Sequence, residues 1–374
     1  MEFRIDKEIF LKALQKVQGI IERRSSMPIL SNVLIEAGES DVTIIATDLE
    51  VGMKSVYPAT VTTCGKITVG AKKLFEIVKE FPDLEITFIS KENDWVEIKC
   101  GKVHFNIVGL SSEEFPYFPV IKDENLFGIE ASVLRGMIDK TCFAICNDDT
   151  KYNLNGLFTK IEADDNDGLH LKMVATDGHR LSVADVPFTG KSSTELEKGV
   201  ILPRKGVMEL RKITDEEPDG ILFFGLMDNS AAIRQDGTYM LMRLIDGEFP
   251  EYKRVIPVAN DRTVVVNREN FMHSTRRMSI ISSDKFKGIM LEISEKEMRI
   301  SSSNPELGDA TEEIDVKYEG EPFTVRFNAR YILDVLAATE TENIRMKFRD
   351  ELSPSIILPE NSDSFISVIM PMRL

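Results

Sequence analysis

Hydrophobic positions along the chain first alternate with polar residues and then recur three and four positions apart, and this order of patterns occurs three times. In the first copy, Phe3 and Ile5 alternate with polar residues and predict a short strand. Apolar residues three and four positions apart over 7–24 predict an amphipathic helix directly after it. Phe127 begins a second copy of this pattern, and Val264 begins a third, weaker one. The chain is therefore expected to consist of three related units.

Each unit is expected to continue with further strands and a second helix. Buried strands that end in polar turns are predicted over 42–46, 169–175 and 298–302, and a hairpin is predicted over 96–100 and 103–107. The six predicted helices, two in each unit, span 7–24, 71–80, 131–142, 203–212, 268–277 and 329–338.

Segments that contain proline separate the units. Residues 115–119 and 249–252 place proline beside aromatic residues, and proline interrupts strand pairing. The predicted fold class is α+β, because helices and antiparallel strands are mixed within each unit. We expect three repeated domains, each with two helices backed by antiparallel sheet, over 1–124, 125–260 and 261–374.

Charge is divided unevenly along the chain. The net charge is −16, which does not fit a simple nucleic-acid binder, yet the six predicted helices together carry more Lys and Arg than Asp and Glu. If each helix buries its apolar stripe on a sheet, a basic face is left exposed in every unit. Such faces suit a polyanion, and contacts to phosphates alone bind without sequence preference. A solvated helix face is the alternative explanation for any single residue.

Other features of the composition bear on location and on metal binding. No apolar run reaches the roughly 18 residues that span a bilayer, and the N-terminus lacks a signal-like segment, so we expect a cytoplasmic protein without membrane contact. Cys142 and Cys146 lie four apart on a predicted helix without histidine nearby, and are expected to be buried small hydrophobes. The acidic doublets at 148–149 and 164–165 are expected to be solvated. We therefore predict no metal and no cofactor.

Residues 175–181 contain the side chains that most resemble an active site. Asp177, His179 and Arg180 stand together at the end of a predicted strand. An acid/base pair of Asp177 and His179 would make the protein a hydrolytic or metal-dependent enzyme. However, no nucleophile accompanies the pair, and Asp48 occupies the equivalent turn of the first unit without a histidine. The protein is therefore expected not to be an enzyme.

Seven motifs, spread in order over the whole chain, resemble the bacterial DNA polymerase III beta subunit family of sliding clamps. They are Met27-Pro28-Ile29-Leu30-Ser31-Asn32, Thr47-Asp48-Leu49-Glu50, Tyr152-x-Leu154-Asn155-Gly156, Ala175-Thr176-Asp177-Gly178-His179-Arg180-Leu181, Pro203-Arg204-Lys205-Gly206, Phe249-Pro250-x-Tyr252-x-Arg254 and Met370-Pro371-Met372-Arg373-Leu374. The resemblance implies a homodimeric ring of six similar domains, with helices lining a hole that encloses double-stranded DNA. It also accounts for basic helices in an acidic chain.

The resemblance further implies a peptide groove between the second and third domains. There the replicative DNA polymerase, the clamp loader and repair proteins would dock short linear motifs. Flexible methionine side chains suit a surface that serves several partners. The matching positions are Leu154, Thr176, Gly178, His179, Arg180, Leu181, Pro250, Val255, Val368, Met370, Pro371, Met372 and Arg373.

Two more sets of positions follow from the resemblance. The chain departs from the family at Lys151 and Asn153, which are often aromatic or arginine in relatives, so no specific single-strand contact is implied at this loop. The residues expected to face DNA are Arg24, Lys72, Lys73, Lys151, Tyr152, Arg204, Lys205 and Arg330. A two-fold dimer uses the same pair of patches twice. The residues expected at this interface are His104, Phe105, Asn106, Ile107, Ile280 and Ile281.

Overall fold

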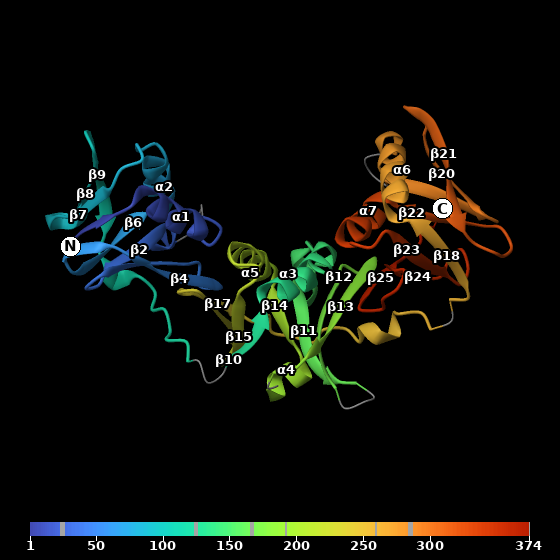
Figure 1. The fold of residues 1–374 in the computed structure, drawn as a ribbon, viewed down its shortest axis with the longest axis horizontal. Coiled ribbons are helices and arrows are strands. Elements are labelled where there is room, and N and C mark those ends of the chain that lie inside the picture. Colours follow the sequence, from blue (N-terminus) through green and yellow to red (C-terminus); the bar gives the residue numbers. More distant parts are fainter. Residues whose placement is uncertain are drawn as a thin grey trace. The chain divides into compact units, whose positions relative to one another are not determined.

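The computed structural model describes residues 1–22, 27–122, 126–164, 168–190, 193–258, 260–282 and 287–373. These residues form two compact units, one of residues 1–132 with 208–244 and the other of residues 133–207 with 245–374. Each unit is built on one continuous antiparallel sheet (Figure 1). None of the helices in the described ranges is long and apolar enough to cross a membrane.

The sheet of the first unit has 13 strands. Their order is β10 (Leu126–Glu130), β15 (Ile221–Met227), β16 (Ser230–Gln235), β17 (Thr238–Arg243), β4 (Val51–Pro58), β3 (Asp41–Thr47), β2 (Asn32–Ala37), β6 (Gly65–Gly70), β9 (Val103–Leu110), β8 (Trp95–Cys100), β7 (Ile86–Ser90), β1 (Glu2–Ile5) and β5 (Thr60–Thr63). The helices α1 (Lys7–Val17) and α2 (Ala71–Lys79) of this unit contact each other.

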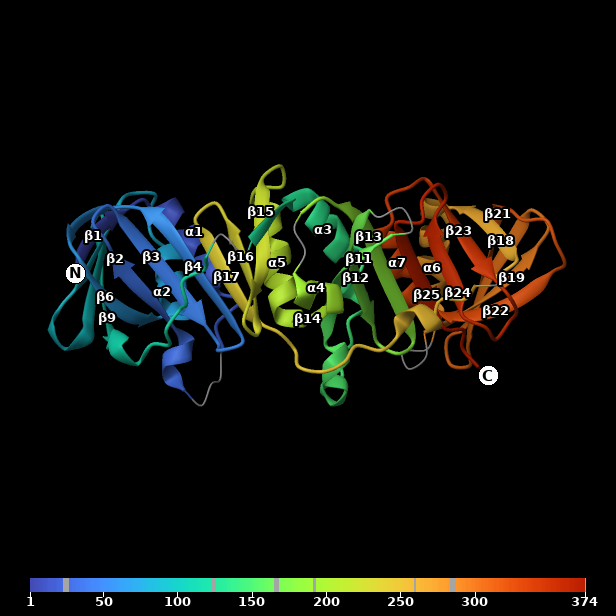
Figure 2. The same ribbon diagram turned by 90° about the horizontal axis from the view of Figure 1, so that it is seen from below.

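The sheet of the second unit has 12 strands. Their order is β14 (Val200–Pro203), β11 (Gly156–Ala163), β12 (Leu169–Thr176), β13 (Arg180–Phe188), β25 (Phe365–Ile369), β24 (Ser355–Pro359), β23 (Asn343–Phe348), β18 (Arg262–Asn267), β21 (Gly308–Lys317), β20 (Glu297–Asn304), β19 (Gly288–Ser294) and β22 (Phe323–Asn328). Figure 2 shows β13, β25 and β24 side by side. The helices α6 (Arg268–Ile281) and α7 (Ala329–Ala338) contact each other.

The helices begin where the sequence supplies a cap. Asp6 accepts hydrogen bonds from the backbone of Glu8 and Ile9 at the start of α1, and Asn267 and Asn328 cap α6 and α7 in the same way. Such side chains satisfy backbone N–H groups that have no partner within the first turn. The helix α4 (Thr194–Lys198), which Ser193 caps, was not predicted.

Aromatic packing holds α1 against its sheet. Phe3 on β1 stacks on Phe88 of β7 with ring centroids 5.0 Å apart, and Phe10 of α1 meets both rings edge-on. All three side chains are fully buried. The strand and the helix that begin the first predicted unit are thus fixed by one cluster, because offset-stacked and edge-on rings pack favourably.

The predicted helix over 329–338 matches α7, and the one over 71–80 ends one residue after α2, but the other four predicted helices end at the wrong residue. Helix α1 ends at Val17 rather than at 24, whereas α6 continues to Ile281 and α5 (Arg204–Glu216) continues past 212. Helix α3 (Ala131–Asp139) ends before 142, because the backbone of Thr141 leaves helical geometry with φ of −129°. The Thr141 hydroxyl, in place of its N–H, donates to the carbonyl of Met137.

The early end of α3 changes the environment of two cysteines. Cys142 lies in a short 3-10 turn (Cys142–Ala144) and Cys146 follows it, so the two are not on one helix as predicted. Cys146 is buried, whereas Cys142 is only half-buried. Within the described ranges, no group of three or more His, Cys, Asp and Glu side chains is placed to hold a metal ion.

Strand pairing continues across both predicted domain boundaries. In the first unit, β4 of the first predicted domain pairs with β17 of the second, and Met53 lies opposite Met240. In the second unit, β13 pairs with β25 of the third predicted domain, and Ser182 lies opposite Ser367. At each boundary, a strand of one domain (β4 or β13) therefore pairs with the last strand of the next domain (β17 or β25). We call each of these pairings a junction.

Candidate functional site

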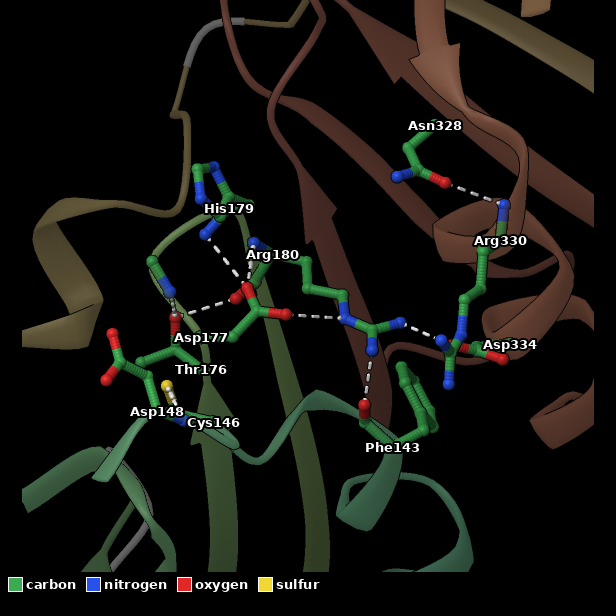
Figure 3. Close-up of polar contacts among 11 residues, drawn as sticks. Phe143, Cys146, Asp148, Thr176, Asp177, His179, Arg180, Asn328, Arg330 and Asp334 are labelled. Carbon is green, nitrogen blue, oxygen red and sulfur yellow. Dashed lines mark hydrogen bonds and ion pairs between the residues drawn. The ribbon is translucent and has the colours of Figure 1, made fainter. Parts of the chain in front are cut away.

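The turn after β12 is held by the carboxylate of Asp177. Its Oδ1 accepts the backbone N–H groups of His179 at 2.9 Å and Arg180 at 3.0 Å, and its Oδ2 accepts Nε of Arg180 at 3.0 Å (Figure 3). The hydroxyl of Thr176 accepts the N–H of Gly178 and donates to the carbonyl of Arg180. Both oxygens of Asp177 are therefore used to shape the turn.

Glycine is favoured at the tip of this turn. Gly178 has φ of +90°, a conformation that side chains with a Cβ rarely adopt. His179, the next residue, is exposed, and its imidazole points away from the Asp177 carboxylate (Figure 3). The contact between the two residues is made by the backbone of His179. This geometry is that of a structural turn and does not form an acid/base pair.

The side chain of Arg180 points toward the interior of the second unit, to which the residue itself belongs. Its guanidinium donates to Asp334 of α7 at 2.6 Å and to the carbonyl of Phe143 (Figure 3). It also lies over the rings of Tyr331, 4.5 Å from the centroid, and Phe143, 5.3 Å from the centroid. Only 8% of the residue is exposed. The predicted groove residue Arg180 therefore ties the turn to α7, and its guanidinium is engaged internally.

Burial also affects Tyr331 beside this arginine. Desolvation raises the pKa of its hydroxyl, and the negative charge of Asp177 adds to the effect. The sequence patterns did not indicate that Tyr331, Phe143 and Asp334 take part in this site. One signal was available for Asp334, because Glu76 and Glu209 occupy the corresponding position in the second helix of the other two repeats.

Other predicted groove residues meet where β13 and β25 pair. Leu181 lies opposite Val368, and both belong to a buried apolar cluster with Tyr252. The chain after β25 continues along the turn, because the N–H of Met370 donates to the carbonyl of His179 at 2.9 Å. Met370 is 37% exposed.

The chain after Met370 is also fixed by its backbone. The N–H of Met372 donates to the carbonyl of Arg326 at 2.8 Å. Pro371 and Met372 are half-buried, whereas Arg373 is exposed. The last described residues therefore leave apolar side chains partly open to solvent beside the turn.

Three predicted groove positions lie on connecting segments. Pro250 and Val255 are exposed on either side of the buried Tyr252, which brings their segment to the same cluster. Leu154 is half-buried at the end of a 3-10 turn (Asp149–Leu154), where its carbonyl accepts the N–H of Cys146.

Most residues predicted to face DNA are accessible. Lys72 and Lys73 on α2 are exposed and both lie near Glu76, with the closer ion pair, from Lys73, at 2.7 Å. Arg330 is exposed on α7, 3.9 Å from Asp334. Of the remaining residues, Lys151, Tyr152 and Arg204 are exposed, Lys205 is half-buried, and Arg24 lies outside the described residues.

The residues predicted at the dimer interface lie on β9 and at the end of α6. His104, Phe105 and Asn106 are exposed on β9, Ile107 is half-buried, and His104 contacts Glu97 on β8. The hydrogen bond from Lys91, aided by those from Lys99 and His104, lowers the pKa of Glu97 to about 2. On α6, Ile280 is 73% exposed and Ile281 is half-buried.

Comparison with known proteins places the whole chain in one group. Residues 1–119 match the N-terminal domain of the DNA polymerase III beta subunit, residues 128–251 match its central domain, and residues 253–373 match its C-terminal domain. The chain is 34% identical to the beta sliding clamp of Vibrio cholerae and 35% identical to that of Pseudomonas aeruginosa, with all of each chain covered.

Solved structures agree with these sequence matches. The sliding clamp (DNA polymerase III subunit beta) of Bartonella birtlesii bound to griselimycin superposes with a TM-score of 0.94 at 35% identity. The clamp of Pseudomonas aeruginosa bound to griselimycin gives a TM-score of 0.92 at 34% identity. Both comparisons cover all of this chain and all of the other.

Proposed function

Because the chain belongs to the DNA polymerase III beta subunit family along its whole length, we infer that it is a DNA sliding clamp of replication. One observation carries this inference: the three repeats correspond, in order, to the three domains of that subunit. The clamp is a homodimeric ring that encircles duplex DNA and tethers the replicative polymerase and other partners to it.

A closed ring is held on DNA by its topology and does not need tight binding. A chain of net charge −16 is not expected to hold DNA tightly by charge, but a closed ring cannot leave a circular duplex. The exposed basic residues Lys72, Lys73, Arg204 and Arg330 lie on helices that would line the hole, where they would contact phosphates. Such contacts carry no sequence information, so the ring can slide.

Retention on circular DNA tests this function. The dimer, loaded onto a nicked circular plasmid, should stay on the DNA during gel filtration at moderate salt. Cutting the plasmid once should release it, because a free end lets the ring slide off. Retention that survives linearisation would contradict encirclement, and a buffer-matched supercoiled plasmid without a nick controls for non-specific adsorption.

A groove beside β13 and β25 would capture partner peptides. The paired Leu181 and Val368 belong to the buried apolar cluster beneath it, and Met370 and Met372 offer flexible, partly exposed side chains. The exposed His179 can hydrogen-bond an extended peptide. These features support docking of linear motifs from the polymerase, the clamp loader and repair proteins in turn.

Strand pairing within each unit suggests how two protomers would meet. The strand that follows the polar turn pairs with the last strand of the next domain, as β4 does with β17 and β13 with β25. The third copy of that strand is β21, and the last strand of the first domain is β9. Among described residues, β21 over 308–315 and β9 over 103–108 each pair on one edge only. We propose that β21 pairs with β9 of the partner subunit, antiparallel.

The same equivalence predicts the register. Met53, Ser182 and Ala310 occupy equivalent positions in the three domains. Each lies opposite a small residue on the preceding strand of its own hairpin: Ala46, Ala175 and Ser302, respectively. On the last strands, the equivalent positions are Met240, Ser367 and Phe105, which lie opposite Ile233, Ile357 and Ile98. Since Met53 faces Met240 and Ser182 faces Ser367, Ala310 should face Phe105 of the partner subunit.

Cysteine cross-linking checks this register. A chain carrying Ala310→Cys and Phe105→Cys should form a dimer band on a non-reducing gel, because directly opposed strand residues meet the geometry of a disulfide. The matched control pairs Ala310→Cys with Asn106→Cys, whose side chain points to the other face of the sheet. Cross-linking of the control in place of the test pair would show a one-residue shift, and the unmodified chain reports the background from its own cysteines.

We also propose the predicted domain bounds, a cytoplasmic location and the absence of catalysis. The domain bounds 1–124, 125–260 and 261–374 lie close to the ends of the three family matches. A cytoplasmic location suits a protein that acts on chromosomal DNA. Absence of catalysis is supported by the use of Asp177 as a structural cap, because both its oxygens accept hydrogen bonds from the turn.

A further inference from the structure

A cavity of about 1020 Å³ lies in the first unit between α1 and the last turns of α5. Tyr57 on β4 and Thr238 on β17 contribute to its wall. Burial raises the pKa of the Tyr57 hydroxyl. Among the described residues, none that was predicted for the groove, for DNA or for the dimer interface lines this cavity.

Two buried side chains in the wall have acceptors that are not satisfied. Glu209 is 5% exposed; its Oε1 accepts Lys212 at 2.7 Å, but its Oε2 has no hydrogen-bond partner in the described part of the chain. Gln235 is also 5% exposed; its Nε2 donates to the carbonyl of Glu217 at 3.0 Å, while its Oε1 lacks a described partner. Buried acceptors without donors are costly. A ligand that donates hydrogen bonds would satisfy both acceptors.

The charge around the cavity has the sign that would attract a cation. Carboxylates in its lining outnumber lysines by five to three. Asp215 and Glu216 stand in the last turn of α5, where the helix dipole already concentrates negative charge. Two lysines of the lining already pair with these carboxylates: Lys16 of α1 pairs with Glu216 at 2.6 Å and donates to Thr238 at 2.9 Å, and Lys212 pairs with Glu209.

The class of cation follows from the side chains present. No group of three or more potential metal ligands is assembled in the described ranges, which argues against a bare divalent ion. We propose that the cavity binds a small linear polyamine, whose ammonium groups donate to Glu209 and Gln235 and offset the acidic end of α5. The bound cation would cancel negative charge between two helices whose exposed faces are proposed to meet DNA phosphates.

Calorimetric titration of the intact dimer with spermidine tests the proposal without DNA. In buffer of constant ionic strength, one saturable site per protomer is expected. Glu209→Gln keeps the side-chain volume but removes the charge, and should weaken binding about tenfold. Lys12→Gln removes a positive charge from the exposed rim of the cavity and should strengthen binding, which keeps the test decisive if the buried variant folds poorly.

The matched control is Glu295→Gln, which makes the same change in net charge on the turn between β19 and β20, outside the cavity. Its spermidine affinity should equal that of the unmodified protein. Absence of saturable heat, or equal weakening by Glu209→Gln and Glu295→Gln, would overturn the proposal. Displacement of spermidine by Mg²⁺ at equal ionic strength would also overturn it, since the site would then hold any cation.

Discussion

Replacing Arg180 by alanine is expected to destabilise the second unit by about 2–4 kcal/mol, less than a fully buried pair because its acidic partners are partly exposed. The change removes ion pairs to Asp177 and Asp334 and leaves the carbonyl of Phe143 without its donor. Denaturant unfolding gives the loss in free energy. Hydrogen exchange should place the loss of protection in β25 and α7.

The control for this change is Arg330→Ala. Arg330 also lies near Asp334, but at 3.9 Å and with an exposed side chain, so its loss should cost less than about 1 kcal/mol. Arg180→Lys should fall between the two, because an ammonium cannot reproduce the planar fork that reaches several partners. Equal losses of unfolding free energy in the two alanine variants would contradict a stabilising role that depends on the buried contacts of Arg180.

The inward orientation of Arg180 explains why the sequence did not reveal its role. The motif predicts a turn, since Asp177 and Gly178 have the residue types that cap and tighten one. The direction of the arginine depends on Asp334, which lies 154 residues away on α7. The pairing of β13 with β25, which contacts α7, brings these groups together.

The fold was predictable where the pattern is local. Periodicity located the three repeats and the helix over 329–338, because the buried faces of these elements are continuous in sequence. Helix ends were less predictable, since α3 stops where the backbone of Thr141 leaves helical geometry, although the apolar spacing continues to 142. The pairing of β4 with β17 and of β13 with β25 could not be predicted, because edge strands carry no local mark of their partner.

The first repeat shows why similar turns differ in use. Asp48 caps its turn through the N–H groups of Glu50 and Val51, as Asp177 does for the second repeat. Leu49 occupies the tip with φ of +76°, where the second repeat has Gly178. The backbone is thus repeated, whereas the side chains at the tip and the segment after the last strand give the second junction its proposed role in docking.

Removal of residues 370–374 is expected to weaken the binding of a polymerase-derived peptide by roughly 100-fold or more, because loss of central apolar contacts has effects of this size at other interfaces. The deletion takes away Met370 and Met372 but leaves β25, which ends at Ile369, and its pairing with β13. Fluorescence polarisation of a labelled peptide measures the affinity. The dimer should persist in sedimentation, because β9 and β21 are untouched.

A further double variant separates the effects of side chains and backbone in this tail. Met370→Ala with Met372→Ala keeps the hydrogen bonds from the two backbone N–H groups to His179 and Arg326. If flexible apolar side chains make the groove, this double variant should lose most of the affinity that the deletion loses. If the tail acts only by bracing the turn after β12, the double variant should bind normally, and unchanged affinity in the deletion itself would refute the groove.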